Sequence, residues 1–222
     1  DDRYELTEIV GRGGCGTVFR ATDLNLDREV AIKVLSAEGE CTQDMITRFE
    51  RESQILRHLH APNTVFFYDI GQTPQGLPYI AMEFVSGKQL KDLLDETHAL
   101  TPEVTVQILI QVFQSLVEAH SYGFVHRDLK PANIMLCELE GEKNFVKILD
   151  FGLAKLAKGD DDVTKEHQLV GSASYMSPEQ ILTGVSDTRT DVYALGVMFY
   201  LMLAGRKPFV GPNDNVILYK HV

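Results

Sequence analysis

Hydrophobic and polar positions alternate in short runs over the first third of the chain. The runs are rich in Val, Ile, Phe and Tyr and are separated by Gly, Asn, Asp and Pro; they span 4–10, 16–23, 28–35, 63–71 and 77–85. Short apolar runs bounded by turn residues are typical of β-strands. The pattern therefore predicts a small antiparallel sheet.

Helical periodicity interrupts this pattern once and later replaces it. Residues 45–59 repeat apolar side chains at helical spacing and predict one helix among the strands. Farther along, Thr101 suits an N-cap and Pro102 the first position of a helix. The predicted helix carries four apolar residues on one face: Ile108, Val112, Leu116 and Ala119. Further helices are predicted from Pro178 and Asp191.

Together these elements predict an α+β protein with two lobes. Residues 1–84 are expected to form a small β-rich lobe and residues 85–222 a larger helical lobe, connected around Glu83 to Gly87. The apolar segment 192–204 is shorter than the ~20 residues that cross a bilayer, so we expect a buried central helix and no membrane segment in this chain.

Composition narrows the choice of partners and compartment. The 222 residues carry a formal net charge of -11, which argues against nucleic acid or an anionic membrane as the main partner. The three cysteines, Cys15, Cys41 and Cys137, are far apart, which indicates reduced thiols rather than disulfides or structural zinc. No secretory signal opens the sequence, and the expected location is the cytoplasm.

A glycine-rich segment, GRGGCGTV, lies between the first two predicted strands. Glycine lets the backbone approach a ligand closely, so Gly11, Gly13 and Gly16 can fold a hairpin over phosphates. The signal is weak by itself. A dinucleotide-binding turn would lead into a helix, whereas the residues after Gly16 continue as a strand.

The run VAIK places Lys33 on the third predicted strand. Alternation puts Ala31 and Lys33 on one face, and an inward-facing lysine needs an anionic partner. The helix predicted over 45–59 offers Glu50 and Glu52. Only Glu52 lies on the apolar face of that helix, so we expect it to pair with Lys33.

Two further segments place hard oxygen ligands and a base close together. In VHRDLKPANIML, residues 125–136, Asp128 can accept a proton, Lys130 can stabilise an anion and Asn133 can bind a metal. Asp150 follows the apolar run VKIL, and with Asn133 it would suit Mg²⁺. An ordinary polar turn is the alternative for each segment taken alone.

These motifs occur in a fixed order: GRGGCGTV, VAIK, Glu52, HRDLKPAN, DFG, SPE and DVYALG. The sequence thereby resembles eukaryotic-type protein kinases from Gly11 to Asp191 and beyond. The forms SPEQ, DREVAIKVL and KPFVG are most similar to bacterial Ser/Thr kinases. The resemblance implies the bilobal protein-kinase fold.

The resemblance also implies the role of each catalytic residue. Lys33, paired to Glu52, would hold the α and β phosphates of ATP, and Asp128 would orient the substrate hydroxyl. Lys130 would stabilise charge on the γ-phosphoryl group. Ser172 would bridge Asp128 and Lys130. The expected ligands of Mg²⁺, or of Mn²⁺ as an alternative, are Asn133 and Asp150.

The nucleotide site follows from the same resemblance. Met82 would be the gatekeeper, the backbones of Glu83 and Val85 would meet adenine, and Met135 would lie beneath the ring. The full expected set is Val10, Gly11, Arg12, Gly13, Gly14, Cys15, Gly16, Val18, Ala31, Lys33, Met82, Glu83, Val85 and Met135. Phe151 and Leu56 would stack with His126 to align the lobes.

The implied function is transfer of the γ-phosphoryl group of ATP to Ser or Thr hydroxyls of protein substrates. Arg127, beside Asp128, is typical of kinases controlled by phosphate in the activation segment. Autophosphorylation is therefore expected at Thr164, with two molecules pairing for the reaction. Ser172 and Ser174 are expected to serve structure.

Two alternatives remain beside this function. A catalytically silent nucleotide-binding scaffold, a pseudokinase, would have lost Lys33, Asp128 or Asp150, and all three are present. A small-molecule phosphotransferase would share the base and metal ligands but would not need the SPEQ segment.

In the family the helical lobe continues beyond LYKHV, where this sequence ends, and a later Arg pairs with the residue equivalent to Glu179. That Arg is absent here. We therefore expect a fragment of a longer protein with lower stability and weaker activity than a complete domain, or another partner for Glu179. Many bacterial members carry a membrane anchor downstream.

Overall fold

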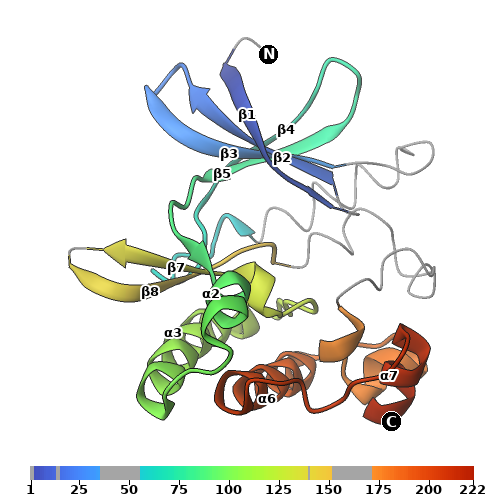
Figure 1. Ribbon diagram of the computed structural model, residues 1–222. Helices are drawn as coiled ribbons and strands as arrows, with labels where there is room; N and C mark the ends of the chain where they lie inside the picture. Colours follow the sequence, from blue (N-terminus) through green and yellow to red (C-terminus); the bar gives the residue numbers. More distant parts are fainter. Residues whose placement is uncertain (1–2, 14–15, 36–55, 140, 152–171) are drawn as a thin grey trace. The chain divides into compact units, whose positions relative to one another are not determined.

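The computed structural model describes residues 3–13, 16–35, 56–139, 141–151 and 172–222, and Figure 1 draws the chain. These residues form two compact units. The first contains 3–13, 16–35, 56–60 and 65–85; the second contains 61–64, 86–139, 141–151 and 172–222. Each unit is described by itself.

The first unit is an antiparallel sheet of five strands in the order β1-β2-β3-β5-β4 (Figure 1). The strands are β1 (Tyr4–Gly13), β2 (Gly16–Asp23), β3 (Arg28–Val34), β4 (Phe67–Gln72) and β5 (Pro78–Glu83). All four pairings are antiparallel, as the sequence predicts. The run 63–71 becomes a strand only at Phe67. The helix predicted over 45–59 lies outside the described residues except for its end, where Leu56 and Leu59 are buried.

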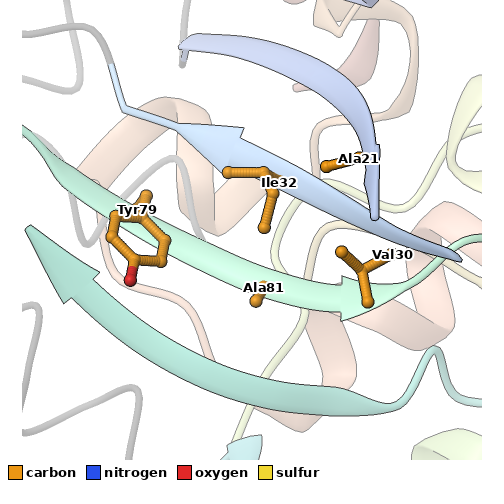
Figure 2. Close-up of a cluster of buried hydrophobic side chains, with 5 residues drawn as sticks. All are labelled: Ala21, Val30, Ile32, Tyr79 and Ala81. Atoms are coloured by element: carbon orange, nitrogen blue, oxygen red, sulfur yellow. The ribbon is translucent and has the colours of Figure 1, made fainter. Parts of the chain in front are cut away.

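One face of this sheet carries an apolar core. Figure 2 shows its five buried side chains, which come from strands β2, β3 and β5: Ala21, Val30, Ile32, Tyr79 and Ala81. Tyr4 packs against this cluster and meets Tyr79 edge-on, with ring centroids 5.9 Å apart. Because side chains alternate along a strand, Lys33 points to the opposite face.

The second unit combines a small sheet with helices. Strands β6 (Lys88–Gln89), β7 (Ile134–Leu139) and β8 (Glu142–Ile148) form the sheet in that order. The helices are α2 (Leu90–Thr97), α3 (Pro102–Ser121), α5 (Pro178–Thr183), α6 (Thr188–Ala204) and α7 (Asp214–His221), with 3₁₀ turns at Pro131–Asn133 and Ala173–Tyr175. Helix α3 packs against β8 and α6 (Figure 1).

The start of α3 confirms its sequence signals. The Thr101 side chain accepts a hydrogen bond from the N–H of Val104, and Pro102 occupies the first turn. The predicted apolar face is also confirmed, because Ile108, Val112, Leu116 and Ala119 are all buried.

Two predictions for α6 are wrong. The helix begins at Thr188 rather than Asp191, because the Asp187 side chain accepts from the N–H of Arg189 and Thr190 completes a capping box. The segment 192–204 is also not buried all round. Leu195, Val197, Met198 and Met202 are buried, whereas Val192, Phe199, Tyr200 and Leu203 are exposed. Within the described ranges, no helix combines the length and hydropathy that a bilayer crossing requires.

Candidate active site

Strand register fixes the surroundings of Lys33. Lys33 lies opposite Val18 on β2 and opposite Ile80 on β5, and Ala31 lies opposite Met82. Directly opposed residues of antiparallel strands point to the same face, so all five share one side of the sheet. Lys33 is only 5% exposed, as expected for an inward-facing lysine. Its predicted partner Glu52 lies outside the described residues.

The glycine-rich segment forms the hairpin between β1 and β2, where Gly13 pairs with Gly16. Gly14 and Cys15 lie outside the described residues. Gly16 has a φ of +136°, and a Cβ there would lie 2.1 Å from the Val34 oxygen. Gly16 is thus required by the fold itself. A Cβ at Gly11 would meet nothing within 4 Å in the described structure.

In the second unit, Asp128, Lys130 and Ser172 form a closed polar triangle. Lys130 Nζ lies 2.7 Å from Asp128 Oδ2 and donates to Ser172 Oγ at 2.9 Å. Ser172 Oγ donates to Asp128 Oδ1 at 2.9 Å. The expected bridge by Ser172 is therefore present. The triangle fixes the carboxylate of Asp128 through both of its oxygens.

The candidate metal ligands are brought together by the pairing of β7 and β8. Asn133 Nδ2 donates to the Asp128 carbonyl at 2.8 Å, which leaves the amide oxygen of Asn133 as the atom to bind a cation. Its own carbonyl accepts from the N–H of Leu149 at 2.9 Å, directly before Asp150. The apolar run VKIL indicates a strand that reaches Asp150, but β8 stops at Ile148 and Asp150 follows with a φ of +57°.

His126 connects the loop of Asp128 to the segment before Asp150. Its Nε2 lies 2.9 Å from the Leu149 carbonyl and its Nδ1 accepts from the N–H of Asp128 at 3.3 Å. These two contacts join the loop of Asp128 to the backbone directly before Asp150. The expected contact with Phe151 is present, with ring centroids 4.8 Å apart, but the two ring planes are tilted by 51° rather than stacked. The contact with Leu56, which belongs to the first unit, stays a prediction.

Asp191 holds the backbone of the same loop. Its carboxylate is fully buried and accepts from the N–H groups of His126 and Arg127, each at 2.9 Å. It also lies 2.7 Å from His120 Nε2. Arg127 has a φ of +68°, an unfavourable conformation for a side chain of its size. The Asp191 bonds stabilise this conformation.

Sequence reasoning assigned no function to Asp191 or Gln180. The motif DVYALG was only a family signature, although a carboxylate at the start of an apolar helix is a signal that could have been followed. Gln180 Nε2 donates to the Arg127 carbonyl at 3.0 Å, and Gln180 also completes a capping box with Ser177 at the start of α5. The SPEQ segment thereby supports the loop from a second side.

Glu179 has a hydrogen-bond partner in the first turn of α6. Thr190 Oγ1 donates to its Oε1 at 3.1 Å. Burial acts to raise the pKa of Glu179, but hydrogen bonds from its own backbone, Ser177 and Thr190 outweigh burial and hold that pKa below its usual range. These hydrogen bonds therefore stabilise the charged form of Glu179.

The expected nucleotide residues divide between the units. Val18, Ala31, Met82, Glu83 and Val85 belong to the first unit, and Met82 is buried. Met135 lies on β7 of the second unit. Their joint contact with one nucleotide remains a prediction.

The chain matches a known protein family over most of its length. The family profile described as "Protein kinase domain" matches residues 4–222. The chain therefore belongs to the protein kinase domain family, which confirms the resemblance and the fold class that the motifs predict.

Its relatives include bacterial kinases. The chain is 42% identical over 225 residues to the serine/threonine-protein kinase PknB of Mycolicibacterium smegmatis, covering 100% of this chain and 35% of that protein. It is 39% identical over 223 residues to the serine/threonine-protein kinase pkn3 of Myxococcus xanthus, covering 99% and 41%. The chain thus spans about a third of the length of the relatives it matches.

Proposed function

We propose that the chain is the catalytic domain of a Ser/Thr protein kinase, which transfers the γ-phosphoryl group of ATP to protein hydroxyls. The triangle of Asp128, Lys130 and Ser172 is the observation that carries this proposal. It offers a fixed base and a fixed cation on one loop. Phosphoryl transfer needs mainly this kind of positioning and charge neutralisation. The names of the relatives support Ser or Thr as the acceptor.

Each residue then has a defined task. Asp128 accepts the hydroxyl proton as the acceptor oxygen bonds to the γ-phosphorus and the bond to the departing ADP breaks. Lys130 stabilises charge on the transferred group. Lys33 would hold the α and β phosphates. Asn133 and Asp150 supply hard oxygens for Mg²⁺, or Mn²⁺, which when bound would neutralise phosphate charge.

A pseudokinase is the second candidate, and the geometry argues against it. A silent scaffold has no use for a carboxylate held through both oxygens beside a lysine. A small-molecule phosphotransferase would not need Gln180 and the SPEQ segment to support the loop. The favoured reading is a protein kinase in the cytoplasm, with a nucleotide-binding lobe over residues 1–84 and a catalytic lobe over 85–222.

The test is transfer of labelled γ-phosphate from ATP to a generic Ser/Thr protein substrate, followed by identification of the labelled amino acid. We expect phosphoserine or phosphothreonine with the wild-type protein and none with Lys33→Met. Equal labelling in both samples would refute the proposal. Label on a small molecule alone would favour the phosphotransferase.

Regulation by autophosphorylation at Thr164 is part of the proposal. Thr164 lies outside the described residues, but Arg127 Nε is buried and makes no hydrogen bond to the part of the chain that the structure describes. A phosphate could pair with this guanidinium through charge-assisted hydrogen bonds. Intact-mass analysis after incubation with ATP and Mg²⁺ should show added phosphate, and Thr164→Ala should remove it. Two molecules would pair for the reaction, so its initial rate should rise with the square of protein concentration.

A further inference from the structure

A cavity of about 690 Å³ opens beside the catalytic loop in the second unit. Lys130, Pro131 and Ala132 of that loop line one part of it. The rest is lined by α2 with its two cap residues, by Tyr175, and by residues from the end of α6 to Lys207; this lining includes the carboxylate of Asp95. The volume lies in the range of ligand-binding pockets. The tasks assigned to Asp128 and the metal ligands do not use this cavity.

The lining contains three lysines that differ in their partners. Lys130 is paired with Asp128 at 2.7 Å, and Lys91 with Asp95 at 3.5 Å. Lys207 is half-buried and forms no ion pair with a carboxylate in the described ranges. A partly buried ammonium without an anion is unfavourable, so an anion from outside the described structure would be stabilised there.

Lys207 is nevertheless held in place. Its Nζ donates to Ser174 Oγ at 3.0 Å and lies 5.5 Å from the centroid of the Tyr175 ring. Burial raises the pKa of Tyr175, so its phenol stays neutral and supplies no counter-charge. Two fixed contacts reduce the conformational entropy that Lys207 loses on binding a ligand.

The cavity and the proposed base lie within reach of one peptide. Lys130 lines the cavity and also contacts Asp128. An extended chain spans ~3.3–3.6 Å per residue, so a side chain a few positions from the acceptor hydroxyl can enter the cavity. The occupant is therefore expected to belong to the protein substrate.

From these observations, and resting on the proposed kinase activity, we infer that this cavity is a specificity subsite for an acidic side chain flanking the phosphoacceptor, with Lys207 as its cationic anchor. A protein with a net charge of -11 repels acidic segments in general. Lys207, which has no carboxylate partner in the described ranges, is the feature that reverses this repulsion beside the active site.

The test compares three peptides with the same acceptor Ser: one with neutral flanks, one with Asp flanks and one with Lys flanks. With the full-length wild-type protein, the Asp-flanked peptide should have a KM about tenfold lower than the neutral peptide, equivalent to ~1.4 kcal/mol. The kcat should change little, because the subsite does not touch the reacting atoms. Equal KM values for the Asp-flanked and neutral peptides would overturn the inference.

Variants assign the preference to Lys207. Lys207→Gln should reduce the KM advantage to about twofold, and Lys207→Glu should shift the preference to the Lys-flanked peptide. Lys143→Gln, which removes an exposed charge outside the cavity, should keep the wild-type preference. An unchanged preference in both Lys207 variants would refute the assignment.

Peptide binding measured by fluorescence anisotropy separates this inference from the proposed function. If no peptide is phosphorylated but the Asp-flanked peptide binds about tenfold more tightly and Lys207→Glu abolishes the difference, the subsite stands and the kinase proposal fails. If peptides are phosphorylated without flank preference, the kinase proposal stands and the subsite fails. If the three peptides neither react nor differ in binding, both fail.

Discussion

Among the residues that the structure describes, each unit buries one carboxylate completely, and the two carboxylates have different partners. In the sheet unit, Asp23 accepts hydrogen bonds from the guanidinium of Arg3 at 2.9 and 3.2 Å, and Arg3 also pairs with Asp69. In the helical unit, Asp191 accepts from two backbone N–H groups and contacts His120. The first carboxylate connects strands through a side chain, whereas the second fixes the path of the loop that carries Asp128.

The difference shows how each unit positions its functional groups. Strand register alone determines which residues surround Lys33. Val18 and Ile80 lie opposite it on the paired strands, and Ala31 shares its face because side chains alternate along a strand. Asp128 lies on an irregular loop, where no register exists. Buried polar contacts must therefore hold it in place.

The largest loss of stability and of kcat is expected when the hydrogen bonds to the Asp191 carboxylate are removed. Asp191→Ala leaves two buried N–H groups and His120 without their acceptor, which should lower the free energy of unfolding by roughly 3 kcal/mol. Displacement of Asp128 should reduce kcat about hundredfold in the protein that remains folded. Urea unfolding and steady-state kinetics measure the two effects. Wild-type kcat in folded Asp191→Ala would contradict the assigned role, and Asp191→Asn, which keeps one acceptor oxygen, should lie between the two.

Asp23→Ala is the matched change in the sheet unit. Arg3 can still reach water, so the loss of stability should be smaller, about 1–2 kcal/mol, and kcat should stay near wild type. The hydrogen bond from Arg3 lowers the pKa of Asp23, so its contribution is fully present above the usual carboxyl pKa and is lost as pH falls from that value through the lower pKa of the folded state. Urea midpoints between pH 7 and 3 should therefore converge for Asp23→Ala and wild type. A kcat loss as large as that of Asp191→Ala would remove the distinction between the two carboxylates.

Ser172→Ala tests the polar triangle without disturbing the loop backbone. A hydrogen bond to a charged group contributes ~1.5–3 kcal/mol to stability, so the urea midpoint should fall modestly. Because Asp128 loses one of the groups that orient it, kcat should fall at least about tenfold. Ser172→Thr keeps the hydroxyl and should restore most of the rate. If Ala and Thr variants behave alike, the hydroxyl does not orient Asp128.

The smallest effect concerns His221, a buried group with no charged partner in the described ranges. Tyr193 Oη lies 2.7 Å from its Nδ1, and burial lowers its pKa by disfavouring the imidazolium. Below about pH 6.5 the unfolded chain then binds more protons than the folded one. Stability should fall, by less than about 1 kcal/mol, between pH 7 and 5.

The control separates His221 from the other histidines. His221→Gln should flatten this part of the pH profile of the urea midpoint, and His58→Gln, at an exposed position, should not. Identical profiles for His221→Gln and wild type would contradict the prediction.

Much of the fold follows from local sequence signals. The apolar runs of the strands and the N-cap at Thr101 depend on local conformational preferences, and the structure confirms both. The start of α6 was misplaced because the apolar run begins inside the helix, whereas the capping residue Asp187 precedes it. Its half-exposed character was missed because hydrophobic content alone does not say which neighbours cover a helix.

The candidate active site also contains a part that was predictable from the sequence and a part that was not. Asp128, Lys130 and Asn133 lie close in sequence, and their proximity was predictable. The support from Asp191 and Gln180 depends on residues more than 50 positions from the loop they contact, as the sequence separations of 53, 64 and 65 show. Only tertiary packing brings these residues together.

The central claim is that Asp128 acts in the chemical step and not in nucleotide binding. The most direct measurement compares the affinity for Mg²⁺·ATP with the rate of a single turnover on a Ser-containing peptide, in wild type and Asp128→Asn. We predict an affinity within about twofold of wild type and a turnover rate lowered at least about thousandfold. A turnover rate within tenfold of wild type, at equal affinity, would contradict the account.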